Sequence, residues 1–117
     1  MGNPVVYFEI LGKDADVLGG FYRDLFGWNV TSVEEGGGYS LVDTGSDEGI
    51  GGGIGAFPQA PSHVTVYVHA DDVAAALARA NELGGTTIMP PREVAPGTEA
   101  ALFADPEGHV VGIMRRT

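Results

Sequence analysis

The chain has 117 residues, which is enough for one domain with a modest hydrophobic core. Its net charge of −10 and its six basic residues make nucleic acids and anionic membranes poor partners, because phosphate binding depends on lysine and arginine. The absence of cysteine excludes disulfides, thiolate metal sites and a cysteine nucleophile. Because no apolar run is long enough for a membrane span and no signal-peptide pattern is present, we expect a cytoplasmic protein.

The first half of the chain predicts a strand, a helix and three further strands. Residues 4–10 form an apolar run typical of a buried strand. Asp14 or Asp16 can cap the following helix, which Gly27 ends. Two neighbouring apolar rows predict a broad buried stripe on this helix. The rows consist of Val17, Phe21 and Leu25, and of Leu18, Tyr22 and Phe26. The three later strands are expected at residues 28–33, 39–42 and 50–57.

The second half repeats this order after a short linker at residues 58–62. Residues 63–68 predict a strand, and Asp71 or Asp72 caps a helix that ends at Gly84. The apolar face of this helix consists of Val73, Ala76, Leu77, Ala80 and Leu83. An extended segment over residues 86–89 is expected to stop at Pro90-Pro91. The last two strands, expected at residues 100–104 and 109–114, form a hairpin.

The two halves therefore have the same order of predicted strands and helix. At a constant shift of 57 positions, Asp14 falls on Asp71 and Gly27 falls on Gly84. Two copies are too few for a solenoid, so we expect an α+β protein with one domain over residues 1–117. Its modules, at about 4–57 and 62–115, would face each other across a pseudo-twofold axis, and a functional site would lie in the cleft between them.

Three segments of the sequence resemble motifs of one superfamily. These segments are Phe21-Tyr22-Arg23-Asp24-Leu25-Phe26-Gly27-Trp28, Leu83-Gly84-Gly85 and Asp105-Pro106-Glu107-Gly108-His109. In this order and spacing they are similar to the vicinal oxygen chelate superfamily, which includes glyoxalase I, bleomycin-resistance proteins and extradiol dioxygenases. The resemblance covers nearly the whole chain and implies two βαβββ modules that enclose a ligand cleft. It also implies a homodimer.

The resemblance implies a divalent metal ion held by four side chains, two of them on the first strands and two on the last strands of the halves. The first-strand positions fall on Val6 and His63. The last-strand positions, where the superfamily has a glutamate, fall on Gly53 and Gly112. Because glycine cannot ligate through a side chain, we expect no metal at this position and no other cofactor. A shifted metal site that uses Glu9 and His63 stays an alternative.

Four residues are candidates for the lining of a ligand site: Tyr7, Glu9, His63 and Tyr67. Tyr7 and Glu9 share one face of their strand, because strand side chains alternate. Glu9 and His63 are the candidates for acid–base catalysis. Glu9 is of interest because burying a carboxylate costs free energy unless it is paired, and such perturbed groups occur often at catalytic sites. The simpler interpretation, which we favour, is that Glu9 faces solvent on a strand with one wet side. The glycines over residues 49–55 lack the lysine of a phosphate-binding loop and would make room for a bulky ligand.

Three classes of function follow from this pattern. The favoured one is a metal-free protein that binds a small molecule in the cleft between the modules. The first alternative is a lyase, isomerase or dioxygenase that uses a displaced metal ion or acid–base chemistry of Glu9 and His63. The second alternative is a partner or regulatory module without chemistry, because a fold alone does not decide function.

Overall fold

The computed structural model describes residues 2–33, 38–56 and 62–116. The turn predicted over residues 34–38 and the linker predicted over 58–62 lie almost entirely outside the described residues, as does the end of the strand predicted to reach Phe57. The chain divides into two compact units, one made of Tyr7–Val64 and the other of Met1–Val6 with Thr65–Thr117.

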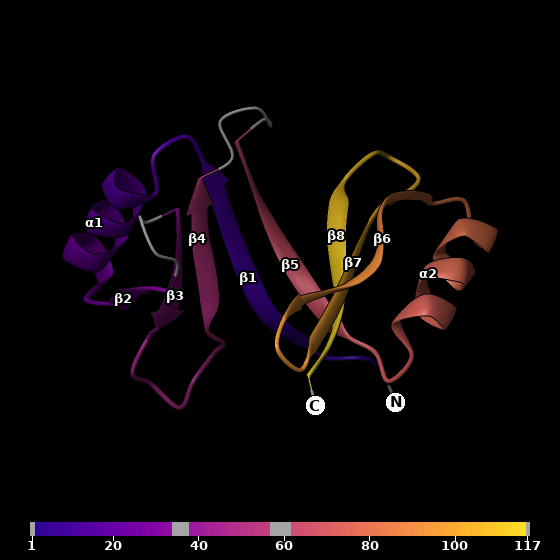
Figure 1. Cartoon of the computed structure of the whole chain (residues 1–117), viewed down its shortest axis with the longest axis horizontal. Helices are drawn as coiled ribbons and strands as arrows, with labels where there is room; N and C mark the ends of the chain where they lie inside the picture. The colour runs from indigo at the N-terminus through magenta and orange to yellow at the C-terminus, as the bar shows by residue number, and fades with distance from the viewer. Residues whose placement is uncertain (1, 34–37, 57–61, 117) are drawn as a thin grey trace. The chain divides into compact units, whose positions relative to one another are not determined.

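The described residues of the Tyr7–Val64 unit form four neighbouring strands and one helix. Figure 1 shows these elements. Its elements are β1 (Val5–Gly12), α1 (Ala15–Phe26), β2 (Asn29–Ser32), β3 (Tyr39–Asp43) and β4 (Gly52–Ala56), with the first two residues of β1 assigned to the other unit. The strands lie in the order β2-β3-β4-β1, in which β4 is antiparallel to β3 and parallel to β1. This is the predicted strand, helix and three-strand order.

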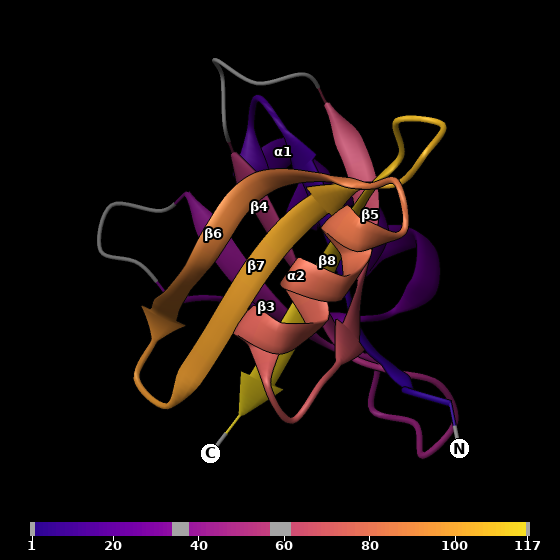
Figure 2. The ribbon, with the colours of Figure 1, turned by 90° about the vertical axis from the view of Figure 1, so that its right-hand side faces the viewer.

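The other unit repeats the same arrangement. It contains β5 (His63–His69), α2 (Val73–Glu82), β6 (Thr86–Ala95), β7 (Thr98–Ala104) and β8 (Val110–Arg116), with the first two residues of β5 assigned to the Tyr7–Val64 unit. Its strands lie in the order β5-β8-β7-β6, with β5 parallel to β8 and the others antiparallel. Figure 2 shows β6 and β7 side by side as a long hairpin, with α2 beside them. The predicted α+β class and its twofold repeat are confirmed.

Both helices begin at an aspartate whose side chain accepts hydrogen bonds from the first turn. Asp14 accepts from the backbone N–H groups of Asp16 and Val17, and Asp72 accepts from that of Ala75. The cap of α2 is therefore Asp72, one residue later than the repeat with Asp14 suggests. Gly27 ends α1 in the left-handed conformation at φ 73°, as predicted.

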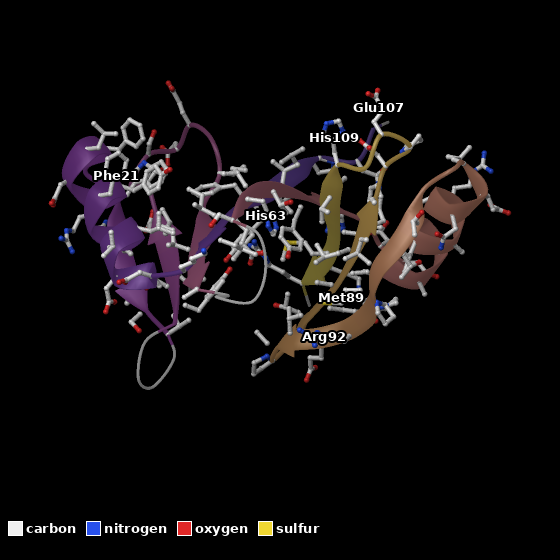
Figure 3. The ribbon with its side chains drawn as sticks, turned by 90° about the horizontal axis from the view of Figure 1, so that it is seen from above. Phe21, His63, Met89, Arg92, Glu107 and His109 are labelled. Atoms are coloured by element: carbon white, nitrogen blue, oxygen red, sulfur yellow. The ribbon has the colours of Figure 1, made fainter. Side chains whose placement is uncertain are left out.

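The buried stripe predicted for α1 is wrong in its extent. Val17 is 66% exposed, and Phe21 and Leu25 are each 58% exposed, so this row faces away from the sheet. Phe21 is labelled on α1 in Figure 3. The residues buried on α1 are instead Ala15 and Gly19. Their small size lets the helix lie close to the sheet: a Cβ on Gly19 would be 3.1 Å from Val30 Cγ1.

The strand expected to stop at Pro90-Pro91 continues through both prolines to Ala95. It can do so because β6 is the last strand of its sheet and, in the described part of the chain, pairs with β7 alone. The pairing also slips between Met89 and Arg92, which are labelled in Figure 3, so the prolines sit at an irregularity of the ladder.

The core of the second unit lies between α2 and its sheet. It consists of Ala70, Val73, Leu77, Ala101 and Ile113. Val73 and Leu77 are confirmed members of the predicted apolar face of α2, whereas Leu83 at its end is 63% exposed. In the Tyr7–Val64 unit the most deeply buried side chain is that of Ile54, on β4.

Candidate functional site

Strand β4 is rich in glycine, and aromatic side chains of the same unit occupy the space over these glycines. A Cβ on Gly52 would meet the ring of Phe8, and a Cβ on Gly55 would lie 2.8 Å from the ring of Tyr39. A Cβ on Gly53 would overlap the hydroxyls of both Tyr39 and Tyr7. The room predicted for a bulky ligand at these glycines is therefore taken by the chain's own side chains.

The side chains of Tyr7, Tyr39 and Glu9 form a hydrogen-bonded cluster, which we call the tyrosine–glutamate cluster. The Tyr39 hydroxyl donates to Glu9 Oε2 at 2.7 Å, and the two tyrosine hydroxyls are 2.7 Å apart. The backbone register explains the meeting, because Glu9 of β1 and Leu41 of β3 both pair with Gly53. Alternation then places Tyr7 beside Glu9 and Tyr39 beside Leu41, on the sheet face opposite Phe8.

The environment of the cluster holds Tyr39 in its neutral form. Burial of the phenol, the negative charge of Glu9 and the hydrogen bond with Tyr7 together raise the pKa of Tyr39 far above its ordinary value of 10.0. A buried phenol without a proton would place a second negative charge beside the carboxylate. Tyr39 therefore serves as a hydrogen-bond donor and not as a base.

The prediction that Tyr7 and Glu9 share a face is confirmed by their meeting in one cluster. The favoured interpretation of Glu9 as a solvated carboxylate is wrong, because Glu9 is half-buried and hydrogen-bonded. The sequence places Tyr39 at the start of a predicted strand, and its bond to Glu9 was not predicted. The signal for it was the run of glycines on β4, which leaves space for large side chains on the flanking strands.

His63 lies at the start of β5 (Figure 3) and is half-buried. It lines an open cavity of about 490 Å³ beside the beginning of α1. The lining residues are Ile10, Leu11, Gly12, Lys13, Asp14, Val17, Leu18, Ser62, His63 and Val64. Leu11 connects this cavity to the cluster's face of the sheet, because its Cδ2 lies 3.0 Å from where a Cβ on Gly55 would be.

Tyr67, the fourth candidate, belongs to the other unit. It is 8% exposed, and its ring lies across Gly112, to which it is paired in the β5–β8 ladder. The Tyr67 ring thus covers a glycine in one unit much as the Tyr39 and Tyr7 hydroxyls cover Gly53 in the other. The predicted ligand cleft between the two modules stays a prediction, as does the acid–base pair of Glu9 and His63.

The residues present do not fit the four-ligand metal site that the fold family implies. The sequence resemblance implies carboxylates of that site at Gly53 and Gly112, and a side chain at either position would displace tyrosines. Across residues 2–33, 38–56 and 62–116, no three His, Cys, Asp or Glu side chains lie close enough to hold a metal ion together.

The order of one strand, one helix and three strands, present twice along the chain, defines a glyoxalase-like protein. The sequence profile of the glyoxalase-like domain family matches residues 7–114. The chain belongs to this family, and with it to the vicinal oxygen chelate superfamily.

The chain resembles other proteins in sequence and in structure. It is 30% identical to the anthracycline biosynthesis protein DnrV of Streptomyces peucetius over 98% of this chain, but it spans only 47% of the length of that protein. Among solved structures, a Streptomyces coelicolor methylmalonyl-CoA epimerase variant bound to 2-nitronate-propionyl-CoA has a TM-score of 0.66 at 18% identity, with 96% of each chain covered.

A Mn(II)-bound glyoxalase from Novosphingobium aromaticivorans has a TM-score of 0.70 at 19% identity, covering 96% of this chain and 38% of that one. At these identities the two structures establish the fold alone. Neither of the described helices, of 12 and 10 residues, is long enough to cross a membrane.

Proposed function

We propose that this glyoxalase-like domain binds a small organic molecule without a metal ion, on the sheet face that carries the tyrosine–glutamate cluster. The observation that supports this most directly is the filling of the space at Gly53 by the hydroxyls of Tyr39 and Tyr7. Where the superfamily resemblance implies a metal carboxylate, the space over Gly53 is occupied by hydrogen-bonded hydroxyls from the two flanking strands, β1 and β3. The fold keeps its arrangement, while the chemistry offered to a ligand changes.

The surroundings of the cluster have the character of a small-molecule site. Such sites measure roughly 300–1,000 Å³ and combine apolar walls with a few converging polar groups. The cavity of about 490 Å³ beside His63 falls in this range, and its Leu11 wall borders the face of the cluster. An apolar part of the ligand can lie along Leu11 while a polar part reaches Glu9 and Tyr7.

The similarity to DnrV supports a small-molecule ligand, because that protein is named for the biosynthesis of a small-molecule product. It does not identify the ligand of this chain, which spans about half the length of the relative. The coenzyme A ligand of the epimerase belongs to that enzyme, whose 18% identity supports only a common fold.

The metal-free part of the proposal is tested by elemental analysis of protein purified without added metal. We expect no stoichiometric zinc, nickel, manganese or iron, and calorimetric titration with nickel or zinc should show no tight uptake. A stoichiometric metal ion that disappears in His63→Ala would overturn it.

The binding part is tested by screening small aromatic and aliphatic fragments against isotope-labelled protein by NMR. We expect the amide signals of Leu11, Gly53 and Gly55 to shift together for the fragments that bind. The amides of Ala101 and Ile113, in the α2 core, serve as an internal control that should not shift. Fragments that shift only the control signals, or none at all, would contradict the proposal.

A second candidate function, acid–base catalysis, has one specific observation in its favour. The chain of hydroxyls from Tyr7 through Tyr39 to Glu9 is a path along which a proton can pass from a ligand to a carboxylate. A lyase or isomerase of this type would lose turnover in Glu9→Gln and in Tyr39→Phe while it still bound its ligand. Equal loss of binding and turnover would favour the binding protein instead.

We also infer a homodimer. The large apolar side chains of Val17, Phe21 and Leu25 are more than half exposed on α1, and Val64 is 67% exposed on β5. A twofold dimer, the commonest oligomer of small proteins, would cover part of this surface. Light scattering at micromolar concentration should give the mass of two chains, and a monomer mass would refute it.

A further inference from the structure

The open cavity beside the start of α1 has a mainly aliphatic wall. Its described lining residues all belong to the Tyr7–Val64 unit, and its volume of about 490 Å³ lies in the range of small-molecule sites. Two of its side chains are largely open to solvent, since Val17 is 66% and Val64 is 67% exposed. A ligand that covers them removes apolar surface from water, which favours binding. The aliphatic side chains of the wall are Ile10, Leu11, Val17, Leu18 and Val64.

Gly12 brings a polar group and part of this wall together. A Cβ on Gly12 would lie 2.7 Å from Leu18 Cδ1 and 3.9 Å from Ser62 Oγ. The end of β1 therefore approaches the leucine closely, and the serine hydroxyl lies beside the same stretch of backbone. A ligand in the cavity can thus contact aliphatic carbon and a hydrogen-bond donor at the same time.

The polar side chains of the cavity offer donors to a ligand more readily than acceptors. In the described part of the chain, neither Lys13 nor Ser62 makes a side-chain hydrogen bond or an ion pair. Asp14, the one carboxylate among the described lining residues, already accepts through Oδ1 from the backbone N–H groups of Asp16 and Val17, both at 3.1 Å. A ligand that accepts hydrogen bonds therefore finds an ammonium and a hydroxyl without breaking a bond inside the unit.

Charge favours an anionic acceptor by a small margin. Lys13 is one of two basic residues in a unit with nine acidic ones, and the other, Arg23, pairs with Asp24 at 3.3 Å. The negative charge of Asp14 lies at the N-terminus of α1, where the helix dipole partly offsets it. A histidine is either neutral or positive, so His63 in the lining does not repel an anion. The acidic remainder of the unit keeps the preference for an anion modest.

We propose that this cavity binds small molecules that combine an apolar body with a carboxylate at one end. The apolar body lies along the aliphatic wall, and the carboxylate accepts hydrogen bonds from Lys13 and Ser62. The inference goes beyond the proposed function, because it assigns a site and a class of ligand that do not depend on the tyrosine–glutamate cluster.

The test uses naphthoate, naphthylmethanol, naphthylmethylammonium and acetate. Each is titrated at neutral pH and low ionic strength into the intact, isotope-labelled chain, and dissociation constants are taken from the amide shifts of Gly12, Leu18 and Val64. We expect naphthoate to bind about fivefold more tightly than the ammonium, as for one exposed ion pair, with the alcohol between them. Acetate, which has the charge but no apolar body, should cause no shift at concentrations that saturate the cavity with naphthoate.

Two variants separate a local ion pair from a general charge effect. Lys13→Gln and Arg23→Gln remove the same charge from the unit, but only Lys13 is among the described residues that line the cavity. Lys13→Gln should lower the affinity for naphthoate about fivefold, whereas Arg23→Gln should change it less than about twofold. Ammonium binding as tightly as naphthoate, or equal effects of the two variants, would overturn the inference.

The positions of the shifts distinguish this inference from the proposed function. Shifts at Gly53 and Gly55 without shifts at the three cavity amides would overturn the inference and leave the proposed function intact. Shifts at the cavity amides alone would support the inference and contradict the proposed place of binding on the sheet face of the tyrosine–glutamate cluster.

Discussion

The substitution Gly53→Ala tests whether tyrosine hydroxyls occupy the space at β4. The added Cβ would overlap the hydroxyls of Tyr39 and Tyr7, so both rings must move away and their bonds to each other and to Glu9 must break. We therefore expect the variant to fold but to be less stable, although alanine is normally the better residue inside a strand.

The magnitude follows from the bonds lost. The hydrogen bond from Tyr39 to a charged carboxylate contributes about 2 kcal/mol, and the neutral bond from Tyr7 contributes about 1 kcal/mol. Replacing glycine with alanine returns about 0.7 kcal/mol of backbone entropy. The balance is a loss of about 2 kcal/mol in the free energy of unfolding, which should lower the urea midpoint by about 1 M or more.

The assay is urea unfolding followed by the fluorescence of Trp28, the single tryptophan, whose ring stacks on Tyr22 in the same unit. Gly20→Ala is the matched control, because its new Cβ would only make an ordinary contact, 3.5 Å from Arg23. In the helix interior we expect it to stabilise the protein by up to about 1 kcal/mol. If Gly53→Ala is neutral or stabilising like this control, the cluster does not fill the space at Gly53.

Three further outcomes are expected. Because the pKa of Tyr39 is raised, ultraviolet titration of wild type and Tyr39→Phe should show the same tyrosinate signal up to about pH 11, and wild-type stability should fall as pH rises above 10.0, where an unfolded Tyr39 ionises. The backbone N–H of His109 leads the contacts that lower the pKa of Asp105, so the stability difference between wild type and Asp105→Asn in urea should be larger at neutral pH than below pH 3.8. Thermal unfolding should show a loss of about 1 kcal/mol in Asp72→Ala and almost none in Asp71→Ala, and the reverse order would restore the cap alignment suggested by the repeat.

The elements of this fold are readable from the sequence because local patterns specify them. Apolar runs mark β1 and β5, and Asp14 and Gly27 delimit α1 through backbone groups close in the chain. The packing of α1 was not readable. A short helix with apolar residues on most sides does not indicate which row meets the sheet, and here two small residues do.

The site was readable only in part, for a similar reason. Alternation within β1 places Tyr7 and Glu9 on one face, and that follows from two positions in one strand. Tyr39, which donates to Glu9, lies 30 residues away, on a strand that is not adjacent to β1. Their meeting depends on the registers of β1 with β4 and of β4 with β3, which no local pattern specifies.

Tyrosine side chains occupy the space at Gly53 and at Gly112 in chemically different ways. At Gly112 the space is covered by the carbon face of the Tyr67 ring, which is buried and adds apolar packing. At Gly53 it is covered by hydroxyl groups that end on the carboxylate of Glu9, which keeps a negative charge on the strand beside β4. A repeat that is nearly symmetric in its backbone is therefore asymmetric in its chemistry. Because the hydroxyls over Gly53 connect to the carboxylate of Glu9, whereas a buried ring covers Gly112, polar recognition of a ligand is expected to depend on the Tyr7–Val64 unit more than on the other.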